Sequence, residues 1–291
     1  MRLDEGRLKL RDKPSLGGHV STSGGIWTSI DRAAEFSFST FQIFSKNQMQ
    51  WNSKPFAPED VQKFRDLLSK SGMKNIMIHA SYLLNMGSVD PVLREKVRNA
   101  FAEEIRRADE LGVELLTFHP GSAGDSDRGV SIRTVGENLN SLIQKEQKVR
   151  ILMETSAGQG KTIGSTFEEL AQMIDVVENK EKVGVCFDTC HVWASGYDIR
   201  SQEGYEETMD RFKSTLGFQN LAGYHLNDSK KGMGSRVDRH EQIGFGTLGL
   251  EGISNFVNDS RFWEKPMILE TPLGEQGYGQ DLERIGTILK R

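Results

Sequence analysis

The sequence is poor in cysteine, has no long apolar run and carries no excess of basic residues, and each shortage excludes a class of protein. Its 2 cysteines, Cys186 and Cys190, are too few for a disulfide-stabilised scaffold, and their spacing is not that of a usual structural zinc site. No apolar stretch approaches the ~20 residues that a membrane helix needs. Residues 1–14 mix charged and apolar side chains and lack the apolar core of a secretion signal. We therefore expect a charged, solvated N-terminal extension on a soluble, cytoplasmic protein.

The charges nearly balance, with 37 lysines and arginines against 41 acidic residues and a net charge of −4. This excludes a uniformly basic surface for nucleic acid but allows a local positive site. Hydrophobic residues make up 36% of the 291 residues, which is typical of a globular protein. No linker rich in proline, glycine or serine divides the chain, so we expect one domain over residues 1–291 and a monomer.

Short apolar segments alternate with amphipathic ones along the chain. The predicted strands are 16–22, 40–45, 75–79, 115–119, 150–154, 183–188, 221–226 and 266–270. Several are apolar almost throughout, which is typical of parallel strands covered on both faces. Between them, apolar periodicity predicts helices at 58–71 and 92–111, the second ended by Gly112, and a capping box headed by Thr166 with Glu169. Repeated alternation of strand and helix predicts an α/β fold, a (β/α)₈ TIM barrel.

Residues able to bind metal fall at the ends of these strands. Five predicted strands end at or beside one, and a sixth residue lies just before the end of another strand: His79, His119, Glu154, Asp188, His225 and Glu270. In a TIM barrel the C-terminal ends of the strands share one rim, where active sites lie. One such residue alone is most simply a hydrogen-bonded rim residue. Six at successive strand ends favour a metal site, because buried imidazoles and carboxylates are costly unless they are paired or bound to metal.

Three further residues extend this set. His191 follows the strand that ends at Asp188, and Asp238 and His240 lie two residues apart in the long irregular segment 227–249. These three side chains could hold one zinc and leave a position open for water or substrate. Taken alone, Asp238 and His240 are most simply interpreted as part of a solvated, charged loop. Mixed histidine and carboxylate ligands suit zinc or manganese better than calcium or magnesium. Bound cations would also give an acidic protein a local positive site for phosphate.

These residues lie in motifs that resemble those of the endonuclease IV family, the zinc-dependent apurinic/apyrimidinic endonucleases. The resemblance runs from about residue 16 to the C-terminus. Its carriers are GGHVS (17–21), HASYL (79–83), FHPGS (118–122), ETSAGQG (154–160), VCFDTCH (185–191), GYD (196–198), HLNDSK (225–230), SRVDRH (235–240) and ILET (268–271). So many motifs in the same order argue against chance similarity.

The resemblance implies a trinuclear zinc site, with manganese as an alternative at one position. The first ion would be held by His79, His119 and a bridging Glu154, the second by Glu154, Asp188, His225 and Glu270, and the third by His191, Asp238 and His240. The implied reaction is hydrolysis of the phosphodiester 5′ to an abasic site in duplex DNA, leaving a 3′-hydroxyl and a 5′-deoxyribose phosphate, together with removal of 3′ blocking groups. A hydroxide bridging two ions would be the nucleophile, with Glu154 and Glu270 as catalytic residues.

The resemblance also implies that rim loops contact the DNA. The residues at the corresponding positions are Asn47, Met49, Tyr82, Leu83 and Arg239. Met49 stands where members of the family place an arginine, so this loop lacks that charge, although a methionine could still wedge between bases. For Tyr82 and Leu83, packing at the rim is the competing interpretation.

Two other functions fit part of the pattern. A sugar isomerase or epimerase of the xylose-isomerase-like barrels would use a single metal held by Glu154, Asp188, His225 and Glu270, but it has no use for the other five ligands. A catalytically silent protein that binds damaged DNA would be expected to have lost a ligand, and every ligand position is filled. Of the remaining candidates, His19 is either a neighbour of the metal ligands or a core histidine, and Cys186 is predicted to be a small buried side chain facing the barrel interior.

Overall fold

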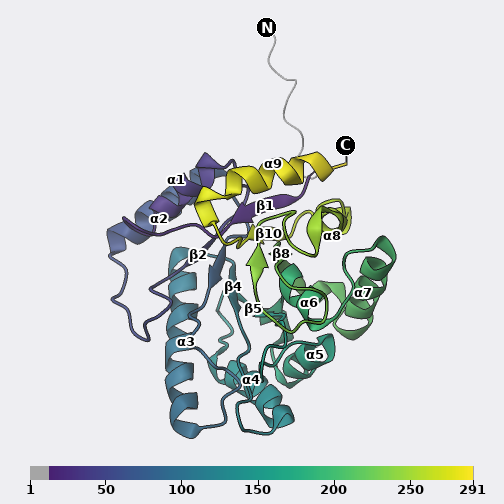
Figure 1. The fold of residues 1–291 in the computed structure, drawn as a ribbon. Coiled ribbons are helices and arrows are strands. Elements are labelled where there is room, and N and C mark those ends of the chain that lie inside the picture. Colours follow the sequence, from purple (N-terminus) through teal and green to yellow (C-terminus); the bar gives the residue numbers. More distant parts are fainter. Residues whose placement is uncertain (1–12, 291) are drawn as a thin grey trace.

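The apolar segments form a parallel barrel in the computed structural model, which describes residues 13–290 (Figure 1). The barrel strands are β1 (Ser15–Gly18), β2 (Gln42–Phe44), β3 (Met77–His79), β4 (Leu115–Phe118), β5 (Arg150–Glu154), β6 (Val183–Asp188), β7 (Leu221–His225) and β10 (Pro266–Leu269). They pair in the order β1-β10-β7-β6-β5-β4-β3-β2. A parallel bridge between His19 and Gln42 joins β1 to β2 and closes the ring. The predicted TIM barrel is confirmed.

Helices follow the strands and surround them (Figure 1). The α-helices are α1 (Thr28–Glu35), α2 (Pro58–Ser71), α3 (Pro91–Leu111), α4 (Arg128–Leu142), α5 (Phe167–Val176), α6 (Thr189–Ser195), α7 (Gln202–Thr215), α8 (Gly249–Val257) and α9 (Tyr278–Ile288). Short 3₁₀ turns lie at η1 (Lys180–Lys182), η2 (Phe218–Asn220), η3 (Ser260–Phe262) and η4 (Gly274–Gln276). In residues 13–290, no helix is both long and apolar enough to cross a membrane.

Local sequence sets the ends of these helices. Gly112 ends α3 in the left-handed region at φ 74°, which favours glycine, as the sequence predicted. Thr166 caps α5, where its hydroxyl accepts a hydrogen bond from the Glu169 amide at 3.2 Å. The predicted capping box is only half formed, because the Glu169 carboxylate accepts instead from the amides of Gly164 and Ser165. Its carboxylate thus fixes the loop before α5 rather than the cap itself.

An apolar layer inside the barrel lies directly beneath the predicted ligands. It consists of Met77, Leu115, Leu152, Cys186, Ala222 and Ile268. Strand alternation places residues i and i+2 on the same face, so Leu152 lies below Glu154, Cys186 below Asp188 and Ile268 below Glu270. This confirms the prediction for Cys186. The layer forms the apolar floor of the site and fills the barrel interior below the predicted ligands.

Two expectations need correction. Pro14, expected at the end of a solvated extension, is buried, while residues 1–12 of that extension lie outside the described residues. The segment 227–249, expected to be irregular, contains a two-stranded antiparallel ladder of β8 (Asp228–Ser229) and β9 (His240–Glu241). Two-residue strands are too short to give a periodic sequence signal. The ladder pairs Ser229 with His240 and so fixes where this predicted ligand lies.

Candidate metal centre

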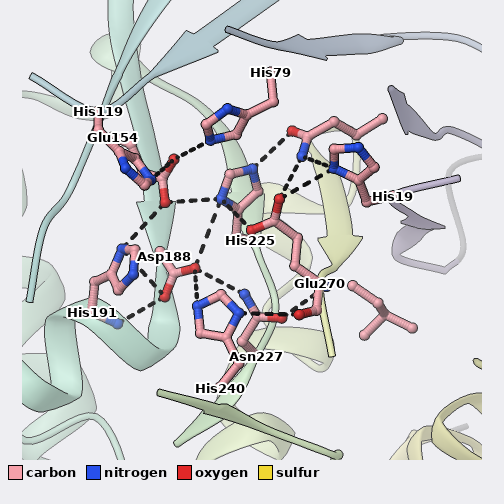
Figure 2. Close-up of polar contacts among 12 residues, drawn as sticks. His19, His79, His119, Glu154, Asp188, His191, His225, Asn227, His240 and Glu270 are labelled. Atoms are coloured by element: carbon pink, nitrogen blue, oxygen red, sulfur yellow. Dashed lines mark hydrogen bonds and ion pairs between the residues drawn. The ribbon is translucent and has the colours of Figure 1, made fainter. Parts of the chain in front are cut away.

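The barrel mouth brings the nine predicted metal ligands together, and Figure 2 labels all of them except Asp238. Within each group the ligand atoms lie no more than 4.8 Å apart, and the groups are His79–His119–Glu154, Glu154–Asp188–His225–Glu270 and His191–Asp238–His240. Five of the 6 histidines of the chain belong to these groups. Residues from six different strands and the loops that follow them therefore converge, as the strand-end pattern predicted.

Glu154 lies at the centre of the cluster. Its Oε2 is 3.2 Å from His79 Nε2 and 3.3 Å from His119 Nε2. Its Oε1 is 3.2 Å from His191 Nδ1 and 3.1 Å from His225 Nδ1. One carboxylate thus faces histidines of all three groups and itself belongs to two of them, as a bridging ligand would.

The spacing of the ligand atoms suits tetrahedral zinc. Bonds of about 2.0–2.1 Å in a tetrahedron place ligand atoms about 3.3 Å from one another. His191 Nε2 lies 3.1 Å from Asp238 Oδ1, and His225 Nδ1 lies 3.2 Å from Glu270 Oε2. His240 Nε2 lies 3.7 Å from the same Asp238 oxygen. The pairs are therefore already close to the separations that a shared zinc ion requires.

Hydrogen bonds to backbone carbonyls orient the rings of His79, His191 and His240. Nδ1 of His79 donates to the Ala80 carbonyl at 2.7 Å, and Nδ1 of His240 donates to the Glu270 carbonyl at 3.1 Å. Because a carbonyl oxygen only accepts, these nitrogens carry the proton and Nε2 is left with a free lone pair. Nδ1 of His191 likewise donates to the Thr155 carbonyl at 2.8 Å, although it also faces Glu154.

Four buried polar atoms at the centre have no hydrogen-bond partner among the described residues. They are Glu154 Oε1, His191 Nε2, His225 Nδ1 and His240 Nε2. Each belongs to a predicted ligand and points at its neighbours in the cluster rather than at a donor or acceptor of suitable geometry. Unpartnered buried polar atoms are costly. A set of divalent cations satisfies all four, so the residues present fit a metal centre.

The charges of the cluster are strongly coupled. Burial alone would lower the pKa of His191, but the carboxylates of Asp188 and Asp238 outweigh it and raise this pKa well above its usual value. Burial alone would raise the pKa of Glu154, but His225 and His119 hold it well below the usual value. The carboxylates therefore stay ionised at neutral pH, as metal ligands must, and His191 has to release a proton when a metal ion binds.

Two residues that the sequence analysis missed hold the ligands in place. Gln42 Nε2 donates to Glu270 Oε1 at 2.6 Å, and Gln42 Oε1 accepts from His225 Nε2 at 2.8 Å, which leaves His225 Nδ1 free. Asn227 Nδ2 donates to Asp188 Oδ2 at 2.8 Å, while its Oδ1 accepts from the Glu270 amide. Such outer contacts orient ligands and affect metal affinity. In the sequence, Gln42 is only one polar residue in a predicted strand, which does not reveal these contacts.

The loop that carries Asp238 and His240 is organised by a second buried carboxylate. Asp228 accepts backbone N–H bonds from Ser229, Gly244, Gly246, Leu248 and Gly249 at 2.7–3.1 Å. Burial raises the pKa of Asp228 although these N–H groups act against the shift. The fold of segment 227–249 is therefore tied to one side chain in the HLNDSK motif.

His19 and Cys190 adjoin the cluster. His19 Nδ1 accepts from Gln42 Nε2 at 2.9 Å and lies 3.4 Å from Glu270 Oε1. His19 is therefore a neighbour of the ligands, one of the two roles that the sequence left open. Cys190 is fully buried, its Sγ lies within 4.8 Å of ligand atoms of Asp188 and His240, and burial raises the pKa of its thiol to about 12.

The predicted DNA-contact residues lie on loops around this centre. Met49 and Tyr82 are 66% and 53% exposed, Asn47 and Arg239 are exposed, and Leu83 is half-buried. Two clefts flank the cluster. One, of about 410 Å³, is lined by ligands such as His119 and by Tyr82 and Arg239. The other, of about 640 Å³, is lined by Asn47 and His19 among others.

Comparison with known proteins places this architecture in a family. The family described as xylose isomerase-like TIM barrel matches residues 30–288. "Probable endonuclease 4" of Thermoplasma volcanium is 44% identical over 283 residues, covering 97% of this chain and 98% of that protein. Its counterpart in Thermoplasma acidophilum is 45% identical over 281 residues, covering 96% of each chain.

Solved structures agree. The crystal structure of endonuclease IV from Thermus thermophilus is similar with a TM-score of 0.84 and 33% identity, covering 94% of this chain and 98% of that one. A D-tagatose 3-epimerase-like protein shares the fold alone, with a TM-score of 0.73 and 17% identity over 94% of this chain and 96% of that one. The identities, the coverage and the shared barrel lead to one conclusion: the chain belongs to the endonuclease IV family of the xylose isomerase-like TIM barrels.

Proposed function

We propose that this protein is a DNA-repair nuclease that hydrolyses the phosphodiester 5′ to abasic sites in duplex DNA. The products would be a 3′-hydroxyl and a 5′-deoxyribose phosphate, and the same centre would remove 3′ blocking groups. The observation that carries this proposal is the set of three ligand groups joined at Glu154. The names of the relatives, which are 44–45% identical, support a nuclease.

The groups would hold three divalent ions, chiefly zinc, with manganese as an alternative at one site. When bound, such ions stabilise charge on a phosphate and lower the pKa of water to about 7, which supplies a nucleophile at neutral pH. The protein's own contribution is to hold Glu154 between two ligand groups. It also keeps the Glu270 carboxylate ionised through contact with Gln42 and His225. No side chain is needed as nucleophile.

Substrate would lie across the barrel mouth. One cleft is lined by the predicted ligands His119, His191 and Asp238 and the other by His19, which adjoins the cluster, so a strand crossing the mouth could reach both of them. Met49 and Tyr82 are exposed, and we propose that they form an apolar wedge into the stacked bases. Asn47, Leu83 and Arg239 are the further residues that we propose contact the DNA.

The alternative is a single-metal sugar epimerase. The group of Glu154, Asp188, His225 and Glu270 alone would suffice for it, and epimerases share this fold. The observation against it is the third group, His191–Asp238–His240, because His191 Nε2 and His240 Nε2 are buried and have no hydrogen-bond partner among the described residues.

A labelled duplex with one tetrahydrofuran abasic analogue tests the proposal. The analogue cannot undergo β-elimination, so strand cleavage reports hydrolysis. We expect one cut, on the 5′ side of the analogue, that a strong chelator abolishes and added zinc restores. Intact duplex without the analogue is the control. Absence of cleavage by the zinc-loaded protein would overturn the proposed function.

A further inference from the structure

Beneath the loops that carry Met49 and Tyr82 lies a buried charged network that the metal centre does not use. Glu104, on α3, is 1% exposed, and the Lys46 side chain beside it is 2% exposed. Lys46 Nζ lies 3.4 Å from Glu104 Oε1. An ion pair so fully removed from water is costly to build and is strongly destabilised when one partner is removed. The buried position of this ion pair, beneath two loops, indicates a specific structural role.

Glu104 contacts both loops at once. Its Oε2 accepts from Ser45 Oγ at 2.7 Å, and its Oε1 accepts from the Ser81 amide at 3.3 Å. Ser45 and Lys46 lead into the turn at residues 46–51, and Ser81 lies in the loop at residues 80–84. The two are also joined directly, since Ser81 Oγ donates to the Gln48 carbonyl at 2.6 Å.

The ion pair also closes the turn that carries Met49. Lys46 Nζ donates to the Trp51 carbonyl at 3.2 Å, so the side chain at the start of the turn holds its end. Within it, Asn47 Oδ1 accepts from the Met49 amide at 2.9 Å. The ammonium of Lys46 is thus used internally and is too buried to contact a phosphate.

Arg107, one turn further along α3, anchors the base of the same segment. It donates to the carbonyl of Ser45 and, at 3.1 Å, to that of Lys54, and its guanidinium lies 3.6 Å from the Phe56 ring centroid. In Figure 1 the chain between β2 and α2 accordingly passes beside α3. Helix α3 therefore presents two buried charges, Glu104 and Arg107, to the segment before α2.

We propose that Glu104 is a positioning residue that holds the Met49 turn and the Tyr82 loop as one preordered unit for entry into DNA. The inference rests on the proposed function. Binding by loops that are already ordered avoids the conformational entropy that flexible loops lose on association. Glu104 would thus act on the affinity for abasic duplex and not on the chemical step, because it contacts no metal ligand.

The test compares Glu104→Gln with Glu110→Gln, a matched variant on a half-buried carboxylate of the same helix that pairs with Arg106. We expect Glu104→Gln to raise KM for the tetrahydrofuran duplex about tenfold, with kcat within about twofold of wild type and metal content unchanged. Amide hydrogen exchange should quicken at residues 46–51 and 80–84. Glu110→Gln should match wild type in all four measurements.

Ser81→Ala keeps both buried charges and removes the direct link to the Gln48 carbonyl. It covers the case in which Glu104→Gln does not fold, and we expect it to raise KM about threefold. The inference would be wrong if Glu104→Gln and Ser81→Ala, or whichever of them folds, showed the KM and the amide exchange rates of wild type. Failure of the proposed function is distinct, since wild type itself would then leave the duplex uncut while the exchange comparison still tests the network.

Discussion

In the metal centre, Glu154, Asp188 and His225 are at most 1% exposed, whereas Met49 and Tyr82 at the loop tips are 66% and 53% exposed. The ligands stand on strand ends above an apolar layer, and hydrogen bonds from outer residues hold them. The tips stand on a turn and a loop held from below by Glu104.

The difference shows two ways of placing functional side chains. The barrel fixes the chemistry through strands shared by the whole fold, so a change there should abolish the reaction. The loops fix recognition through a few local contacts, so a change there should alter affinity by small factors. Variants in the two regions should therefore separate into large effects on kcat and modest effects on KM.

Glu270→Gln should give the largest effect. The change keeps the volume of the side chain but removes a negative charge from a ligand that lies 3.2 Å from His225 Nδ1. We expect cleavage of the abasic duplex to fall about a thousandfold, equivalent to about 4 kcal/mol of transition-state stabilisation, while binding persists. Single-turnover cleavage and gel-shift binding measure the two. Glu264→Gln, on an exposed residue outside the cluster, is the control, and a near-wild-type rate in Glu270→Gln would contradict the assignment.

His240→Ala should come next. It leaves only His191 and Asp238 in the third group, and the loss of a ligand should cost at least the ~10–100-fold in metal affinity that outer contacts cost. We expect a folded protein with about two metals per chain and cleavage reduced about a hundredfold. Elemental analysis and cleavage on one preparation check this.

Glu241→Ala, at the next residue of β9, supplies the control, because Glu241 belongs to none of the ligand groups formed by the described residues. It should retain about three metals. If His240→Ala kept its full metal content, the assignment of a third metal site would be wrong, and the single-metal epimerase would be favoured.

Met49→Arg should give the smallest effect. One added cation near the phosphates contributes about one counterion to the salt dependence, so affinity for abasic duplex should rise about threefold more at 50 mM than at 200 mM salt. Binding isotherms over a salt series measure it. A salt slope identical to wild type would mean that the turn does not approach DNA.

The sequence predicted the barrel and the cluster of candidate ligands because both follow strand periodicity. Glu154, Asp188 and Glu270 each end an apolar run, so their convergence follows from the barrel once the strands are known. The contacts that hold these residues in place could not be predicted from the sequence. Gln42 is only one polar residue in a strand, and the two-residue ladder at His240 has no periodicity.

The loops were harder to predict, because their contacts have no periodicity in the sequence. The matching positions of Met49 and Tyr82 came from the family motifs, and nothing in the pattern distinguishes the buried Glu104 from its half-buried neighbour Glu103 on the same helix. Burial of Glu104 depends on Lys46, 58 positions earlier in the chain, and only the folded structure brings the two together.

The central claim is that three metal ions, held around Glu154, serve phosphodiester hydrolysis. The most direct measurement is a zinc titration of chelator-stripped protein, with cleavage of the tetrahydrofuran duplex as the readout. We predict that activity rises until about three equivalents of zinc are bound per chain and then stays constant. Full activity after a single equivalent, or no recovery at any zinc concentration, would contradict the account.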